Sequence, residues 1–137
     1  MTLALIDAIN KTGEKVLEDT ANNFVRWIED GEFTADGKVF DVGRTYLMAI
    51  RNYESNAEKP GEWGENYEFR NGNGSLMRIS HLIFYCHYKN MNNEGIYECV
   101  KKVSSITHKH EIRVMGYYIY VFIWNWVVEG KYFIWGL

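Results

Sequence analysis

The sequence predicts an all-α fold, and three observations support this prediction. In most segments apolar residues recur three and four positions apart, the spacing that gathers them on one face of a helix. Runs that alternate apolar and polar residues are few, and Pro60 is the only proline, which disfavours a sandwich or barrel of strands. A length of 137 residues with 47% hydrophobic residues indicates one domain with ample material for a core.

The first third of the chain is expected to form three helices. Residues 2–11 have the pattern of a short amphipathic helix. Residues 14–30 follow the same spacing, and Gly31 stands where a glycine commonly ends a helix. Asp41 can cap a third helix, which runs to about Tyr53.

A long polar connection over residues 55–73 separates these helices from the rest of the chain. Connections of this length inside a compact domain are usually functional or disordered. A fourth helix is predicted over residues 75–88, directly after the connection. The pair Asn92-Asn93 then caps a fifth helix, which reaches Val103.

The last predicted helix is opened by Thr107 and His108 and carries an apolar run over residues 114–128. This run is shorter than the roughly 20 apolar residues that a membrane span needs, and Arg113 and Glu129 flank it. We therefore expect a helix buried within the domain, and no membrane partner.

Composition narrows the remaining classes of function. The formal net charge is −3 and no basic stripe stands out, which argues against nucleic acid as a partner. Cys86 and Cys99 both lie in apolar helical patterns, so free thiols in a reducing compartment are expected rather than a disulfide. The first residues lack the basic start of a signal peptide, so a cytoplasmic location is expected.

The segment Asn71-Gly72-Asn73-Gly74-Ser75 is the best candidate for a ligand site. Glycines let a ligand approach the main chain closely, and a helix that starts just after them directs unpaired N–H groups at an anion. The residues alone therefore permit a phosphate or diphosphate cradle. They equally permit a loop that ends in a helix cap, which is the commoner case.

No other pattern in the chain points to catalysis or to a metal. His108 and His110 are two positions apart, so a helix would direct them to different faces. The sequence contains no C-x-x-C, no H-E-x-x-H and no D-x-x-D or D-D motif. The residues thus predict neither a catalytic group nor a magnesium site.

Three blocks of sequence, taken in their order and spacing, resemble the ADP-ribosylglycohydrolase family, the relatives of dinitrogenase-reductase-activating glycohydrolase. The blocks are Phe24-Val25-Arg26-Trp27 with Gly31-Glu32-Phe33-Thr34, then Asn71-Gly72-Asn73-Gly74-Ser75-Leu76-Met77-Arg78, and Ser105-Ile106-Thr107-His108-Lys109-His110. The segment 37–43 also fits, and the likeness extends to about Gly130.

This resemblance implies an all-α domain that hydrolyses the glycosidic bond between ADP-ribose and a side chain or small molecule, using two magnesium ions. It implies that the loop of Asn71, Gly72, Asn73, Gly74 and Ser75 lies along the diphosphate and ribose of ADP-ribose. Gly43 would lie near the same phosphates, and His108 close to a ribose. The expected partner is therefore ADP-ribose or an ADP-ribosylated substrate.

The chain also departs from the family. The Thr-Asp-Asp-Thr/Ser motif that holds the first metal would stand before Met1, and the Asp-x-x-Asp-Thr/Ser motif would lie beyond Leu137. We therefore expect residues 1–137 to be one partial domain without its N- and C-terminal metal-binding motifs. This chain would bind no cofactor, in contrast to the two Mg²⁺ of intact members, and would be inactive alone.

Three functions remain open. The chain is a shortened glycohydrolase, a non-catalytic module that binds ADP-ribose or a protein partner, or one half of an enzyme completed by a second polypeptide. Apolar helix faces without neighbours also predict a homo-oligomer. The large residues expected in its interface are Trp124, Trp126, Phe133, Ile134 and Trp135.

Overall fold

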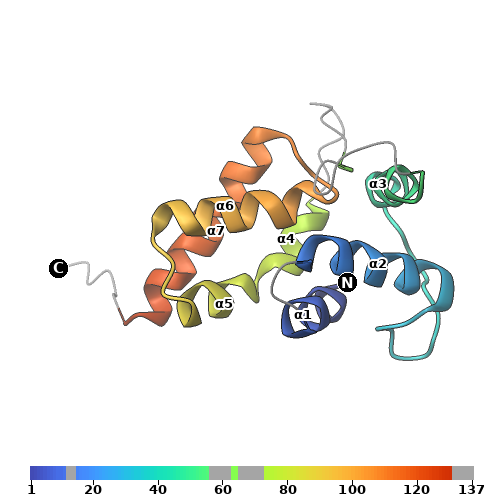
Figure 1. The fold of residues 1–137 in the computed structure, drawn as a ribbon, viewed down its shortest axis with the longest axis horizontal. Helices are drawn as coiled ribbons and strands as arrows, with labels where there is room; N and C mark the ends of the chain where they lie inside the picture. Colours follow the sequence, from blue (N-terminus) through green and yellow to red (C-terminus); the bar gives the residue numbers. More distant parts are fainter. Residues whose placement is uncertain (12–14, 56–62, 65–72, 131–137) are drawn as a thin grey trace.

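The structure is a computed structural model that describes residues 1–11, 15–55, 63–64 and 73–130. These described residues form seven helices and no strand, which confirms the predicted all-α class (Figure 1). The helices, in chain order, are α1 (Thr2–Lys11), α2 (Val16–Asp30), α3 (Arg44–Glu54), α4 (Gly74–Ile79), α5 (Leu82–Tyr88), α6 (Asn93–Ser105) and α7 (Glu111–Val128).

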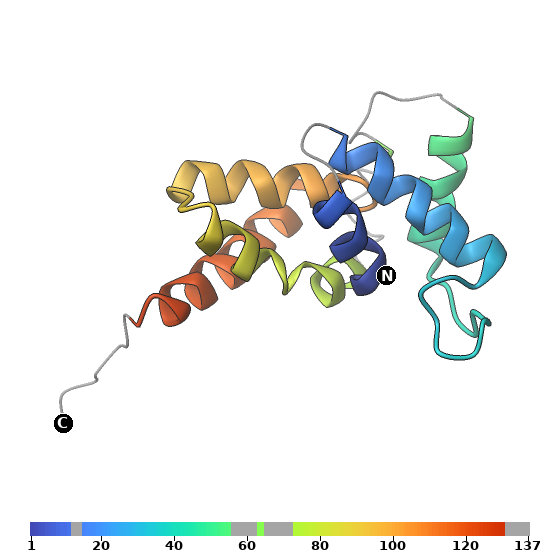
Figure 2. The ribbon, with the colours of Figure 1, turned by 60° about the horizontal axis from the view of Figure 1, so that its bottom comes forward.

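The helices form two groups that meet at the short helix α4. Figure 1 shows α4 in the middle of the molecule, with α5, α6 and α7 on one side and α1, α2 and α3 on the other. Figure 2, which turns the molecule, shows the same division, with α6 lying along α5 and α7. Helix α4 contacts α1, α6 and α7, so it joins the two groups.

Each group has its own apolar core. The larger core belongs to the α4–α7 group, with Leu5 of α1 added, and its centre includes Leu82, Val100 and Val121. The smaller core gathers Phe24 of α2 with residues from α1, α3 and the α6–α7 connection. Within the described residues, no helix is both long enough and apolar enough to cross a membrane.

Two helix ends lie where local signals predict them. Gly31 follows α2 in the left-handed conformation, with φ at 69°. A side chain there would also collide with the Gly37 carbonyl oxygen, which lies 2.0 Å from the point that a Cβ atom would occupy, so glycine is required for two reasons. The Asn92 side chain accepts a hydrogen bond from the Gly95 N–H at 2.8 Å, which makes it the predicted cap of α6.

The helix predicted over residues 75–88 is in fact two helices, with a break at Ser80 and His81. The His81 ring nitrogen Nδ1 makes a hydrogen bond with the Arg78 carbonyl oxygen at 2.9 Å, and so occupies an acceptor of the backbone helix ladder. The break lets α4 pack between α1 and α6 while α5 packs along α7.

Two other predicted helix starts were wrong. Helix α3 begins at Arg44 with Gly43 as its N-terminal flanking residue, so Asp41 lies exposed before the helix. Thr107 and His108 do not open the last helix, because α7 begins only at Glu111. Both residues are buried in the α6–α7 connection, where the main chain turns back on α6.

Candidate functional site

Tyr46 of α3 connects three regions that the sequence singled out. Its backbone N–H donates to the Gly43 carbonyl oxygen at 2.9 Å, and its hydroxyl donates to the Gly74 carbonyl oxygen at 2.5 Å. Its ring meets the His108 imidazole edge to face, with 5.5 Å between the ring centroids. The fold therefore brings Gly43, Gly74 and His108 around one buried tyrosine.

Gly43 and Gly74 differ in the space that is available for a side chain at each position. Gly43 is exposed, and a Cβ atom there would meet only the Tyr46 ring at an ordinary 3.7 Å. A Cβ atom at Gly74 would lie 2.4 Å from Cε2 of Tyr46, which is a severe overlap. Because Gly74 has no side chain, the Tyr46 ring can thus pack closely against the main chain at this position.

Of the other residues in the predicted loop, Asn73 lies at the surface and Ser75 in the interior. Asn73 is exposed just before α4, and its Oδ1 accepts a hydrogen bond from Nη1 of Arg113 at 3.4 Å. Ser75 is fully buried, and its hydroxyl donates to the Ser104 hydroxyl at 3.3 Å. The predictions for Asn71 and Gly72 lie outside the described residues.

His108 is buried and electrically neutral near pH 7. Burial is the main reason that its pKa falls to about 4, and the positive charges of Arg78 and Arg113 lower it further. Its Nδ1 makes a hydrogen bond with the Thr107 hydroxyl at 2.8 Å. A neutral imidazole can donate or accept a hydrogen bond, for example with a sugar hydroxyl, but carries no charge for a phosphate.

Arg78 supplies the buried charge of this region. Its guanidinium donates from Nη1 to the Tyr46 hydroxyl at 2.8 Å and from Nη2 to the Val103 carbonyl oxygen at 3.1 Å. It also lies over the rings of Phe24 and Tyr46, at 5.2 and 5.4 Å from their centroids. Among the described residues no carboxylate forms an ion pair with it, and its buried Nε has no hydrogen-bond partner.

A pocket of about 330 Å³ opens beside Asn73, between the start of α4 and the first turns of α7. Arg113 and the rings of Tyr117 and Tyr120 line it. Gly116 also lines it, and a Cβ atom there would meet nothing within 4 Å. The pocket thus combines a guanidinium with aromatic surface, a combination suited to an anionic group attached to a ring.

Part of the long connection reaches the same region. The described pair Trp63-Gly64 lies against the α6–α7 connection, where the Gly64 N–H donates to the Ser105 carbonyl oxygen at 3.1 Å. The buried Trp63 ring meets the Tyr53 ring edge to face, and its carbonyl oxygen accepts from the Asn52 amide at 3.0 Å. Gly64 thereby lies close to the backbone of His108.

The described residues do not fit a pair of magnesium ions. Within them, no three side chains of His, Cys, Asp or Glu lie close enough together to hold a metal. Magnesium prefers carboxylate and water oxygens, whereas the charges that act on His108 are the guanidinium groups of Arg78 and Arg113. The arrangement is suited to holding an anionic or sugar-like ligand and contains no evident hydrolytic group.

Sequence reasoning missed the roles of Tyr46 and Arg78. In the sequence, Tyr46 is only an apolar position of its helix, and Arg78 only the last residue of a matched block. For Arg78 the sequence did contain one signal, a lone arginine between Met77 and Ile79 in an apolar stretch. If such an arginine is buried, it needs a polar partner. Nothing local pointed to Tyr46, whose partners are distant in sequence.

Comparison with known proteins gave two matches. The profile of the family described as ADP-ribosylglycohydrolase matches residues 1–134. The ADP-ribosylarginine hydrolase Tri1 of Pseudomonas putida (strain GB-1) is 28% identical over 109 residues. That match covers 79% of this chain but only 28% of the relative, so the chain spans less than a third of that protein's length. No solved structure matches.

The overlap at Gly74 gives a first prediction. Gly74→Ala should destabilise the fold by about 1–3 kcal/mol, because the added methyl group must displace the Tyr46 ring. Gly116→Ala is the matched control and should stabilise by up to about 1 kcal/mol, since it faces open space inside a helix. Urea unfolding followed by circular dichroism measures both. An equal cost of Gly74→Ala with and without Tyr46→Leu would contradict the explanation.

The low pKa of His108 gives a second prediction. Between pH 6.5, the ordinary value, and pH 4 the unfolded chain binds a proton at this residue that the folded chain does not. Stability should therefore fall as the pH falls through this window, by on the order of 3 kcal/mol from this group, and level off below pH 4. Urea midpoints measured from pH 7 to 4.5 should depend less on pH in His108→Gln. His87→Gln, at an exposed histidine, should keep the wild-type dependence.

Proposed function

The chain belongs to the ADP-ribosylglycohydrolase family, and from this premise we propose that it carries the ADP-ribose-holding part of a glycohydrolase site. In this proposal the loop at Asn73, Gly74 and Ser75 lies along the diphosphate and ribose. His108 lies close to a ribose, and Gly43 near the phosphates. Asn71 and Gly72 belong to the same loop.

The contacts of Tyr46 are the observation that supports this proposal most. Tyr46 binds the carbonyl oxygen of Gly74 and packs on the ring of His108, although the three residues are far apart in sequence. Arg113, beside Asn73, adds a positive charge to the lining of the neighbouring pocket. A guanidinium is the side chain best able to bind phosphate oxygens through paired hydrogen bonds.

We propose further that these residues alone do not hydrolyse the substrate. Two-metal hydrolysis needs carboxylates that position both ions and the attacking water. The described residues offer no such cluster, so the carboxylates and the two Mg²⁺ would be supplied from outside them, for instance by a companion polypeptide. The name of the relative suggests ADP-ribose attached to arginine as the substrate class.

Two general properties belong to the same proposal. The exposed face of α7 would be covered by a second copy of the chain, because it presents Ile112, Met115, Ile119 and Ile123 at helical spacing. Trp124 lies beside this face, whereas Phe133, Ile134 and Trp135 lie outside the described residues. A cytoplasmic location is supported by the two cysteines, both of which are free thiols.

Calorimetry with ADP-ribose tests the binding site. The wild-type chain should bind, and Arg113→Gln should weaken binding roughly tenfold, the effect of about 1.4 kcal/mol from a lost phosphate contact. Lys89→Gln removes the same charge at the far end of α5 and should leave the affinity unchanged. Gly74→Val should abolish binding. A folded wild-type chain that shows no binding at millimolar ADP-ribose would refute the proposal.

The same protein tests the absence of hydrolysis. Incubated with Mg²⁺ and a peptide ADP-ribosylated on arginine, it should release no free ADP-ribose above the uncatalysed rate, as followed by chromatography. Steady turnover by the pure chain would contradict this part of the proposal without affecting the binding result.

Light scattering tests self-association through α7. The wild-type chain should be a dimer or a larger assembly at micromolar concentration, and Ile119→Glu should shift it to the monomer by placing a charge in the apolar face. Asn10→Glu, which adds the same charge on the exposed side of α1, is the control. A wild-type monomer at high concentration would count against the interface.

A further inference from the structure

A second, larger pocket lies on the other side of the α4–α7 group, away from Asn73. Its volume is about 490 Å³, within the range of small-molecule sites in proteins. Helices α1, α2, α5 and α6 line it, and its walls are mainly apolar, with Ile9, Leu17, Leu82, Tyr85, Met91 and Val103 among them. The candidate site for ADP-ribose uses none of these residues.

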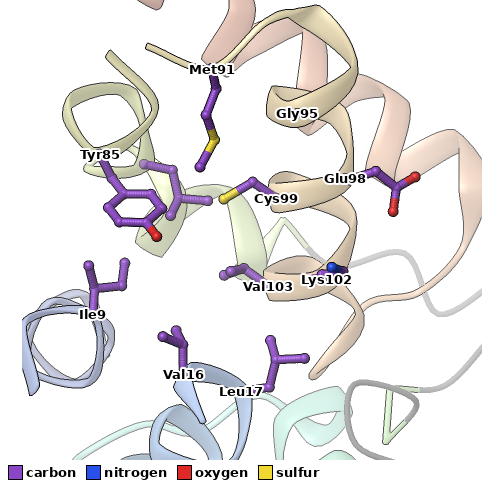
Figure 3. Close-up of a pocket in the computed structure, with 11 residues that line it drawn as sticks. Ile9, Val16, Leu17, Tyr85, Met91, Gly95, Glu98, Cys99, Lys102 and Val103 are labelled. Carbon is purple, nitrogen blue, oxygen red and sulfur yellow. The ribbon is translucent and has the colours of Figure 1, made fainter. Parts of the chain in front are cut away.

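One reactive group faces this pocket. Figure 3 shows the Cys99 sulfur directed from α6 into the space between Met91, Tyr85 and Val103. Glu98 and Lys102, its neighbours on α6, are exposed at the rim. A molecule bound among the apolar walls would therefore lie against a thiol.

Cys86, the second cysteine, affects the ionisation of the Cys99 thiol. The Cys86 thiol is fully buried in the core and makes a hydrogen bond with the Cys99 thiol. This hydrogen bond, aided by the charge of Lys102, lowers the pKa of Cys99 and raises that of Cys86. Of the two thiols, Cys99 is thus both the one that the pocket reaches and the one that loses its proton more readily.

We propose that this pocket binds small apolar molecules, and that Cys99 is modified there by those that carry an α,β-unsaturated carbonyl group. The Cys99 sulfur, after giving its proton to solvent, forms a bond with the β-carbon of the ligand. The carbon–carbon double bond opens, its electron pair passes to the carbonyl oxygen as an enolate, and the α-carbon takes a proton from water. The reaction is an addition, so no leaving group and no oxidant is involved.

Two aldehydes with the same reactive group and different chain lengths test this proposal. The wild-type protein is incubated with trans-2-nonenal or trans-2-pentenal, and adduct formation is followed by intact-protein mass spectrometry. Each rate is divided by the rate of the same aldehyde with glutathione. The longer, more apolar aldehyde should react at least tenfold faster on this relative scale, and peptide mapping should place the adduct on Cys99. Equal relative rates, or modification mainly at Cys86, would overturn the proposal.

Binding can be separated from reactivity in the same assay. An excess of 1-nonanol, which cannot react with the thiol, should slow the modification by nonenal because it occupies the pocket. Val16→Trp should fill the pocket from α2 and remove the preference for the longer chain, while Cys99 still reacts with pentenal. Cys99→Ser should abolish the adduct and Cys86→Ala should retain it. Failure of 1-nonanol to slow the wild-type reaction would contradict a binding pocket, whether or not the variants fold.

Discussion

The buried guanidinium of Arg78 is the interaction on which the arrangement of the helices depends. Arg78 leaves α4 at the boundary of the two apolar cores and contacts the Phe24 ring from one and the Val103 carbonyl oxygen from the other. A buried charge is costly unless polar groups surround it, and here a phenol, backbone carbonyls and two aromatic faces do so. If the helices packed differently, the Arg78 guanidinium would be buried between the cores without these partners. The need to keep the partners therefore restricts how the two groups of helices can pack.

Tyr46 extends this constraint to the candidate site. Its hydroxyl accepts a hydrogen bond from Arg78 and donates one to the Gly74 carbonyl oxygen, so the start of α4 is held by the same network that holds the cores together. Gly74, in the loop that we propose to hold ADP-ribose, therefore serves packing in this structure.

The charges around Arg78 and Tyr46 also restrict the kind of ligand that the described residues can hold. Burial, aided by the charges of Arg78 and Arg113, lowers the pKa of His108, so the imidazole stays neutral while the guanidinium groups provide the positive field. Such surroundings favour an anionic ligand such as a diphosphate and disfavour a cluster of metal cations. The described residues around His108 thus carry positive charge, and within that part of the chain no cluster of metal-ligating side chains is present.

The sequence by itself determined the all-α class, the ends of α2 and α6 at Gly31 and Asn92, and the family, because helix spacing, caps and short motifs are local properties. Only the tertiary structure decided the break between α4 and α5, the burial of Ser75 and Arg78, and the meeting of Tyr46 with Gly74 and His108. These features arise from contacts between residues tens of positions apart; the hydrogen bonds of Tyr46 span 28 and 32 positions. Local sequence patterns do not identify such partners, because these residues become neighbours only when separate helices pack.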